Sequence, residues 1–205
     1  MEQYNRSKLL IATHNPGKIR EFEAIFNHLA VEYLTLTDVG MVEEIPETGD
    51  SYAANALLKA TAACRATGLF TLADDSGLEV DALGGRPGLY AARYAGPNAT
   101  NADRWAKLFG ELGDTPQAGR TARFRCAIAL AHPSGETQVV EGACEGQIAF
   151  APAGTGGFGY DPLFYMPEYG CTMAELDEAI KNQVSHRARA AQKAKAVILE
   201  WLQTL

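Results

Sequence analysis

A short apolar run that ends in two adjacent carboxylates constrains the fold of this chain more than any other feature. The run Phe70–Ala73 has the length and composition of a buried strand, and Asp74-Asp75-Ser76-Gly77 follows it directly. Successive side chains of a strand point to opposite faces of a sheet, so we expect Asp74 and Asp75 to play different parts. These residue types also dominate turns, so an ordinary turn after Ala73 is the alternative.

Two neighbouring carboxylates at a strand end have a specific chemical use. Mg²⁺ takes oxygen ligands and usually keeps several waters in its shell. A carboxylate beside such a water can also act as its general base. Asp74 and Asp75 are therefore candidates for a metal site, for a general base, or for both.

The chain begins with a strand, a helix and a second strand. Leu9–Ala12 is a short apolar run bounded by a turn, as expected of a buried strand. Pro16-Gly17 then opens a helix whose apolar residues recur at helical spacing. Val31–Leu36 has the composition of the second strand. This order predicts an α/β fold.

A second helix is predicted over Tyr52–Thr67, and it carries two polar residues among alanines. Asn55 and Lys59 are four residues apart and so share one helix face. That face either lines a cleft or faces water. Asp50 or Ser51 can cap the start of this helix, and Gly68 ends it.

The remaining elements complete a mixed sheet with helices. We expect an extended segment at Leu78–Ala82, a helix at Asn101–Leu112, a long hairpin of Thr121–Ala131 and Gln138–Phe150, a short strand at Leu163–Tyr165, and helices near Met173–Lys181 and Ser185–Leu202. No repeat or linker interrupts the pattern, and the length of residues 1–205 fits one large domain or two closely packed lobes.

Composition excludes several classes of partner. The net charge of −7 and pI of about 5.1 argue against a general nucleic-acid or anionic-membrane binder. The four cysteines are dispersed, without zinc-ligand spacing, as in a reduced protein. No apolar run is long enough to span a membrane, and no signal core is visible. We expect a soluble, cytoplasmic protein.

The stretch Thr13-His14-Asn15-Pro16-Gly17-Lys18 lies where the first strand passes into the first helix. A helix N-terminus presents unpaired N–H donors, which suit a phosphate, and Lys18 adds a positive charge. The stretch is not a Walker A loop, because Ile19 stands where that loop has Ser or Thr. A plain helix cap is the alternative.

Two later stretches are candidates for nucleotide recognition. Ala153–Phe164 is the segment richest in glycine, and the glycines beside Phe158 leave its ring available to stack on a base. The alternative is a tight hairpin with Phe158 in the core. Ser185-His186-Arg187 opens the last helix, with Ser185 as a cap; a cation such as Arg187 is unfavourable there without an acceptor-rich partner.

In this order the motifs resemble the inosine triphosphate pyrophosphatase family, the XTP/dITP diphosphatases. The resemblance extends from about Leu9 to Leu202. The motifs that carry it are Thr13-His14-Asn15-Pro16-Gly17-Lys18, Glu47-Thr48-Gly49, Asn55-Ala56-Leu57-Leu58-Lys59-Ala60, Ala73-Asp74-Asp75-Ser76-Gly77-Leu78, Gly84-Gly85-Arg86-Pro87-Gly88-Leu89-Tyr90-Ala91-Ala92-Arg93-Tyr94, Pro152-Ala153-Gly154-Thr155-Gly156-Gly157, Phe158-Gly159-Tyr160-Asp161-Pro162 and Ser185-His186-Arg187.

The resemblance implies a fold and an activity. It implies one nucleoside triphosphate pyrophosphatase domain, an elongated α/β fold of two lobes with a central mixed twisted sheet flanked by helices, and an active site in the cleft between the lobes. It also implies hydrolysis of ITP, dITP and XTP to the monophosphate and pyrophosphate, dependence on Mg²⁺, and a homodimer.

The resemblance further implies a role for each motif. Phosphates would be held by Thr13, His14, Asn15, Pro16, Gly17, Lys18 and Lys59. The metal would be served by Glu47, Asp74 and Asp75, with Asp75 as the proton acceptor. The nucleotide would be contacted by Ser76, Phe158, Gly159, Tyr160, Asp161, Lys181, His186 and Arg187. In one departure from the family, Ala54 stands where members often carry Glu.

Two other functions remain as alternatives. A nucleotide-binding sensor without catalysis would use the glycine-rich loop and the basic residues, but it would not need Glu47, Asp74 and Asp75 together. A Maf-type nucleotide pyrophosphatase would share a similar fold with a different base preference. Phe158-Gly159-Tyr160-Asp161 and Ser185-His186-Arg187 favour the branch that acts on deaminated purines.

Overall fold

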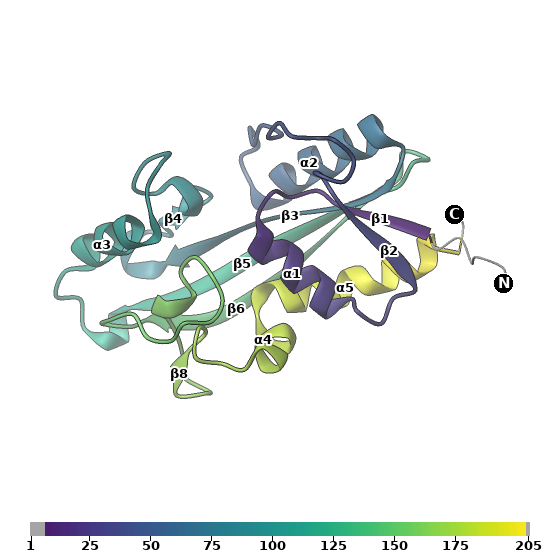
Figure 1. The fold of residues 1–205 in the computed structure, drawn as a ribbon. Helices are drawn as coiled ribbons and strands as arrows, with labels where there is room; N and C mark the ends of the chain where they lie inside the picture. Colours follow the sequence, from purple (N-terminus) through teal and green to yellow (C-terminus); the bar gives the residue numbers. More distant parts are fainter. Residues whose placement is uncertain (1–6, 204–205) are drawn as a thin grey trace. The chain divides into compact units, whose positions relative to one another are not determined.

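The computed structural model describes residues 7–203 (Figure 1). The elements follow the chain in the order β1 (Ser7–Ile11), α1 (Pro16–Ile25), β2 (Val31–Thr35), α2 (Tyr52–Thr67), β3 (Phe70–Val80), β4 (Pro87–Gly88), α3 (Asn101–Leu112), β5 (Thr121–Ala131), β6 (Thr137–Ile148), β7 (Phe164–Met166), β8 (Cys171–Thr172), α4 (Glu178–Val184) and α5 (His186–Trp201). Short 3-10 turns connect several of them.

The strands form one mixed sheet in the order β2-β1-β3-β5-β6-β7-β8, with β4 paired to β3. Strand β1 runs parallel to both of its neighbours, so Leu10 lies opposite Leu34 of β2 and Thr71 of β3. Strand β7 is antiparallel to β6 and to β8. The predicted α/β class with a mixed sheet flanked by helices is confirmed.

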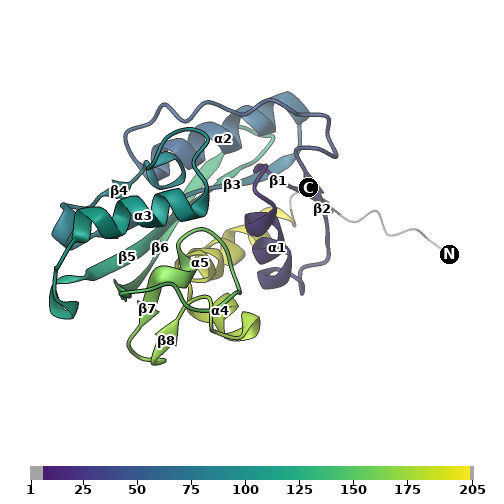
Figure 2. The same cartoon turned by 60° about the vertical axis from the view of Figure 1, so that its left-hand side comes forward.

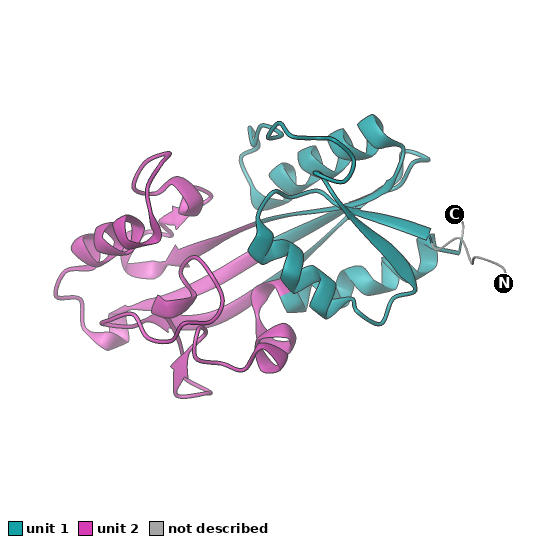
Figure 3. Cartoon of the chain, viewed as in Figure 1, with its two compact units in different colours: residues 1–75, 126–142, 188–205 teal, residues 76–125, 143–187 magenta. Residues whose placement is uncertain are grey.

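The chain divides into two compact units (Figure 3). Unit 1 comprises residues 1–75, 126–142 and 188–205, and unit 2 comprises residues 76–125 and 143–187. Strands β3, β5 and β6 each contribute residues to both units, and along β3 the boundary falls between Asp75 and Ser76.

Unit 1 has helices on both faces of its strands (Figures 1 and 2), and apolar residues are buried beneath them on each face. Alternation along β1 sends Leu9 to one face and Leu10 to the other. Helices α1 and α5 cover the face of Leu9 with aromatic and aliphatic side chains, and α2 covers the other face. Because α2 contributes mainly alanines there, its backbone lies close to the sheet.

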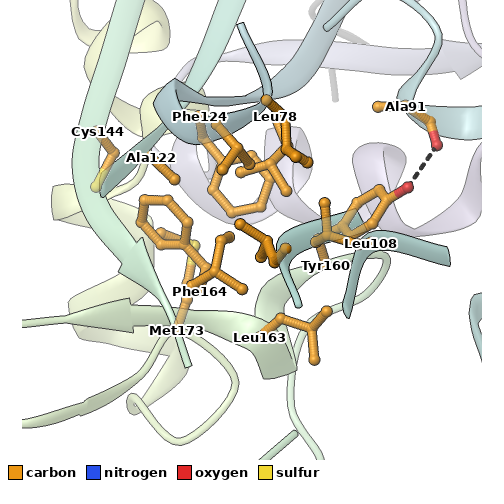
Figure 4. Close-up of a cluster of buried hydrophobic side chains, with 14 of the residues drawn as sticks. Leu78, Ala91, Leu108, Ala122, Phe124, Cys144, Tyr160, Leu163, Phe164 and Met173 are labelled. Carbon is orange, nitrogen blue, oxygen red and sulfur yellow. Dashed lines mark hydrogen bonds between the residues drawn. The ribbon is translucent and has the colours of Figure 1, made fainter. Parts of the chain in front are cut away.

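Unit 2 has its own core, which Figure 4 shows in close-up. The rings of Phe124 and Phe164 lie 4.5 Å apart at its centre. Leu108 of α3 and Leu163 pack in the same cluster. Tyr160 is buried here as well, and its hydroxyl donates a hydrogen bond of 3.0 Å to the carbonyl of Ala91.

The predicted helix boundaries of α2 are confirmed. Ser51 is the N-cap, and its hydroxyl accepts the N–H of Ala54 at 3.2 Å. Gly68 ends the helix in the left-handed conformation, with φ of 69°. At α1, the side chain of Asn15 caps the helix by accepting the N–H groups of Gly17 and Lys18.

Two sequence predictions of secondary structure are wrong. The strand expected over Phe70–Ala73 does not end there in a turn, because β3 continues through Asp74 and Asp75 to Val80. The local turn preference of these residues is outweighed by pairing along the strand and by the lysines that compensate the buried carboxylates. The helix expected near 173–181 begins only at Glu178, because Met173 still bonds to Phe164 within the core.

Two expectations from composition can be compared with residues 7–203. Cys64, Cys126 and Cys144 are buried free thiols, and Cys171 is partly buried and also free. In this part of the chain no helix has the length and apolar character needed to cross a membrane.

Candidate active site

Strand β3 places Asp74 and Asp75 on opposite faces of the sheet in unit 1. Asp74 lies toward α1, where the Lys18 ammonium is 3.0 Å from its Oδ1. Asp75 lies toward α2, where Asn55 Nδ2 donates to its Oδ2 at 3.0 Å. The expectation that the two side chains point to opposite faces is therefore confirmed. Both residues are buried, with exposed fractions of 1% and 7%.

Lys59 of α2 connects two carboxylates from different segments. Its Nζ lies 2.6 Å from Glu47 Oε1 and 3.8 Å from Asp75 Oδ1. Asn55, one helical turn earlier, is 2% exposed, and Lys59 is also buried. The face that these two residues share is therefore turned to the acidic residues and not to water. We call Lys18, Glu47, Lys59, Asp74 and Asp75 the carboxylate–lysine cluster.

The cluster shifts the protonation of its members. Burial raises the pKa of Asp75, and the neighbouring Lys59 and the hydrogen bond from Asn55 only partly offset this effect. For Lys59, burial lowers the pKa, but attraction by Asp74, Asp75 and Glu47 outweighs burial, so its pKa is raised. Lys59 is thus an ammonium ion at neutral pH, and Asp75 holds a proton more readily than an exposed carboxylate does.

Asn55 ties the loop that carries Glu47 to Asp75. Its Oδ1 accepts the N–H of Gly49 at 2.8 Å, while its Nδ2 donates to Asp75. A side chain at Gly49 would begin 2.7 Å from the Ala54 Cβ and 2.9 Å from Asn55 Oδ1, which is too close. The loop can therefore approach α2 this closely only with glycine at this position.

The predicted phosphate loop lies at the N-terminus of α1. His14, Asn15 and Pro16 are exposed, Thr13 is partly exposed, and Gly17 is buried. The Thr13 hydroxyl accepts the N–H of Asn15 at 3.2 Å. The helix cap suggested by the sequence is present, and beside it Lys18 brings a positive charge to Asp74.

The donor set of this cluster suits a hard divalent cation. Glu47 and Asp75 approach a single positive group, the Lys59 ammonium, so their oxygens converge on a cation. Carboxylate oxygens are also the ligands that Mg²⁺ takes. Within residues 7–203, no three acidic, histidine or cysteine side chains already form a metal-holding group.

A second group of predicted residues gathers around Phe158 in unit 2. Asp161 Oδ2 accepts the N–H of Phe158 at 2.8 Å and lies 2.6 Å from Lys181 Nζ. The Lys181 ammonium is 5.2 Å from the centre of the Phe158 ring, and the Arg187 guanidinium is 5.5 Å from it. We call Phe158, Asp161, Lys181 and Arg187 the Phe158 cluster.

The backbone before Phe158 leaves no room for a side chain. Gly157 has φ of 68°, and a Cβ there would overlap Asp161 Oδ2 and lie 2.8 Å from Lys181 Nζ. Phe158 itself is partly exposed and lies outside the core of unit 2. The alternative of a core Phe158 in a tight hairpin is therefore wrong, and the buried Asp161–Lys181 pair fixes the loop instead.

The other residues predicted to contact the nucleotide have different surroundings within unit 2. Arg187 is almost fully buried and donates to Ser76 Oγ at 2.9 Å. The His186 ring stacks on Phe124 at 4.6 Å. Gly159 belongs to the loop of Phe158, whereas the side chain of Tyr160 belongs to the core. Ser185 lies between α4 and α5, where it ends α4.

Three residues that the sequence analysis did not assign to the site contact it. Asn55 was noted for its helix face, and its spacing from Lys59 was the available signal. Cys126 donates from Sγ to Asp74 Oδ2 at 3.7 Å. Trp105 of α3 donates from Nε1 to the carbonyl of Gly159 at 2.9 Å. The last two come from distant segments, and no local pattern marks them.

Comparisons with known proteins place this arrangement in a family. The model of the Ham1 family matches residues 9–197. The chain belongs to the Ham1 family. This confirms the family resemblance of the motifs, since residues 9–197 contain every one of them.

Individual Ham1 relatives match over nearly their full length. The dITP/XTP pyrophosphatase of Geobacillus kaustophilus is 54% identical over 186 residues, which cover 91% of each chain. The solved Ham1 protein of Staphylococcus aureus has a TM-score of 0.84 at 40% identity and covers 95% of this chain and 99% of its own. The HAM1 protein of Coxiella burnetii has a TM-score of 0.85 at 39% identity, with the same coverage.

Proposed function

We propose that this chain hydrolyses ITP, dITP and XTP to the nucleoside monophosphate and pyrophosphate, consuming one water. The observation that carries the proposal is Asp75, a buried carboxylate held by Asn55 and facing Lys59. The Ham1 relative from Geobacillus kaustophilus, at 54% identity, is named dITP/XTP pyrophosphatase, which supports the same substrates here.

Asp75 is the proposed general base. It takes a proton from the water that attacks the α-phosphorus. The Asn55 amide fixes the orientation of its carboxylate. The bond from the α-phosphorus to the bridging oxygen breaks, and pyrophosphate leaves with the added negative charge. Lys18 and Lys59 stabilise that charge.

Mg²⁺ is the proposed cofactor, and Glu47, Asp74 and Asp75 are its proposed ligands. When bound, it would neutralise phosphate charge and polarise the attacked phosphoryl group. Without a cation, the carboxylates of the cluster would repel a triphosphate. A chelator should therefore abolish turnover, and added Mg²⁺ should restore it.

The Phe158 cluster is proposed to read the base. An aromatic ring stacks on any purine, so Phe158 supplies affinity without selecting among bases. Arg187 carries only donors, which match the 6-oxo group of hypoxanthine or xanthine and oppose the amino group of adenine. Asp161 and Lys181 hold the loop of Phe158 in place.

We also propose a homodimer that works in the cytoplasm. Unit 2 carries three exposed aromatic side chains, Tyr90, Phe150 and Tyr169, of the kind enriched at protein interfaces. Sedimentation equilibrium of the purified protein should give twice the mass of one chain, and a single-chain mass would contradict the dimer.

The two alternative functions are not favoured. A sensor without catalysis does not need the paired lysines and carboxylates of unit 1, and the Maf-type alternative is not the family that matches the chain.

The position of cleavage tests the proposed function. Purified protein with Mg²⁺ is given ITP, dITP, XTP, GTP and ATP, and phosphate is measured with and without added inorganic pyrophosphatase. We expect phosphate only when the pyrophosphatase is present, and far more from ITP, dITP and XTP than from ATP. Phosphate released without the added enzyme would show cleavage at another bond and contradict the proposal.

A further inference from the structure

Lys59 occupies an unusual position for a lysine that is assigned to phosphate binding. Its ammonium contacts Glu47 and Asp75, two of the carboxylates proposed to bind metal. Lys18, in contrast, has Asp74 as its acidic contact. Lys59 thus lies at the one point in the cluster where carboxylates from the loop before α2 and from β3 converge on a single positive charge.

We propose that Lys59 is a counter-ion that exchanges with the metal. Mg²⁺ binds Glu47 and Asp75 only when the Lys59 ammonium leaves them, and the ammonium then neutralises the phosphates of the substrate. The inference rests on the proposed metal-dependent function. It adds that Lys59 and Mg²⁺ compete for the same carboxylate oxygens, so the ammonium must leave before the metal binds.

The parts that must move are able to do so. Lysine carries its charge on a flexible four-carbon stem, so its ammonium can be redirected without moving α2. Glu47 lies in the stretch between β2 and α2, which has no regular secondary structure, and its side chain is 30% exposed. The backbone beside it is fixed by the Gly49–Asn55 hydrogen bond, so movement is confined to the two side chains.

The exchange couples metal binding to nucleotide binding. A triphosphate attracts the ammonium away from Glu47 and Asp75, which raises the affinity for Mg²⁺. By linkage, Mg²⁺ raises the affinity for the triphosphate by the same factor. Each ligand thereby favours the other, because Mg²⁺ takes the place of the ammonium at Glu47 and Asp75 while the ammonium moves to the phosphates.

The test measures Mg²⁺ binding to the nucleotide-free protein by titration calorimetry. Lys59→Met removes the competing charge and should bind Mg²⁺ roughly tenfold more tightly than the unsubstituted protein. Lys59→Arg keeps a charge between the carboxylates and should bind weakly. Lys8→Met is the matched control, because it removes one exposed positive charge outside the cluster, beside Glu32, and should leave the affinity unchanged.

Thermal unfolding gives a second readout that does not depend on activity. Lys59→Met should have a lower Tm than the unsubstituted protein without Mg²⁺, and a larger rise in Tm when Mg²⁺ is added. A Lys59→Met protein that binds Mg²⁺ equally or more weakly would overturn the exchange. So would one that stays unfolded at saturating Mg²⁺, because the metal should replace the lost ammonium.

The two proposals fail in different ways. If the unsubstituted protein releases pyrophosphate from ITP but Lys59→Met shows no gain in Mg²⁺ affinity, the exchange is wrong and the function stands. If the unsubstituted protein releases no pyrophosphate from any deaminated nucleotide, the proposed function is wrong.

Discussion

The two clusters use charge in opposite ways. In the carboxylate–lysine cluster of unit 1, lysines from helices α1 and α2 pair with acidic side chains, and the charges nearly cancel. In the Phe158 cluster of unit 2, two cations, Lys181 and Arg187, lie near the partly exposed Phe158 ring, and the cluster holds one carboxylate, Asp161, which pairs with Lys181. The first arrangement suits a metal and phosphates, and the second suits a base with acceptor atoms.

This difference implies that the chemical step and the choice of base can be changed separately. Substitutions in unit 1 should alter the rate for every nucleotide alike. Substitutions in the Phe158 cluster should alter nucleotide binding. Among them, only substitution of Arg187 should alter the ratio of kcat/KM for ITP over ATP.

The largest effect is expected from Asp75→Asn. The amide is nearly isosteric but cannot accept the proton, so kcat for ITP should fall by roughly 10²–10⁴-fold. Steady-state pyrophosphate release measures kcat, and circular dichroism checks the fold. If the folded variant has a near-normal kcat, Asp75 is not the general base and Asp74 becomes the candidate.

Arg187→Ala should give the next largest effect. Without its donors, the preference for ITP over ATP in kcat/KM should narrow by roughly 10²-fold. Arg187 is buried, so thermal unfolding must show that the variant is folded. Arg187→Lys keeps the charge and tests whether the planar donor group matters. Equal losses for ITP and ATP would make Arg187 a structural or phosphate residue.

Phe158→Ala should weaken nucleotide binding without changing selectivity. Loss of stacking should cost roughly 1–3 kcal/mol for every purine nucleotide, because each base offers a ring face. Calorimetry with ITP and ATP on the Asp75→Asn background measures the affinities without turnover. Phe158→Tyr keeps the ring and should bind as the unsubstituted protein does. A loss confined to ITP would assign base reading to Phe158 itself.

The smallest effect is expected from Trp105→Phe. This change removes the hydrogen bond from Nε1 to the Gly159 carbonyl and keeps the aromatic packing. The free energy of unfolding should fall by about 1 kcal/mol in urea titrations. KM for ITP should rise slightly, because Gly159 follows Phe158, whereas kcat should stay the same. A fall in kcat with unchanged KM would mean that α3 acts on the chemical step.

Helix α2 shows how much of the fold could be predicted from local sequence. Its bounds, its N-cap Ser51 and its stop at Gly68 follow from short-range chemistry that the structure retains. Strand β3 shows the limit. Asp74-Asp75-Ser76-Gly77 has the local signature of a turn, yet the strand continues because Lys18 and Lys59, which come from other elements, compensate the buried charges.

The same limit applies to the site. The sequence identified Lys59 and Asp75 as chemically suited residues, but their pairing joins positions 59 and 75 through the packing of α2 on β3. Tyr160 stands in the same motif as Phe158, yet its side chain lies in the core and bonds to the carbonyl of Ala91. Which side chains of a motif can reach a ligand depends on contacts with residues far along the chain. One such contact is the hydrogen bond from Trp105 to the carbonyl of Gly159.

The central claim is that the carboxylate–lysine cluster sets the rate of hydrolysis and the Phe158 cluster selects the base. The selectivity ratio tests it most directly. The ratio of kcat/KM for ITP over ATP is measured by pyrophosphate release on the unsubstituted protein, Asp75→Asn and Arg187→Ala side by side. We predict that Asp75→Asn slows both substrates and keeps the ratio, while Arg187→Ala narrows it. A ratio that changes as much in Asp75→Asn as in Arg187→Ala, or that changes in neither, would contradict the account.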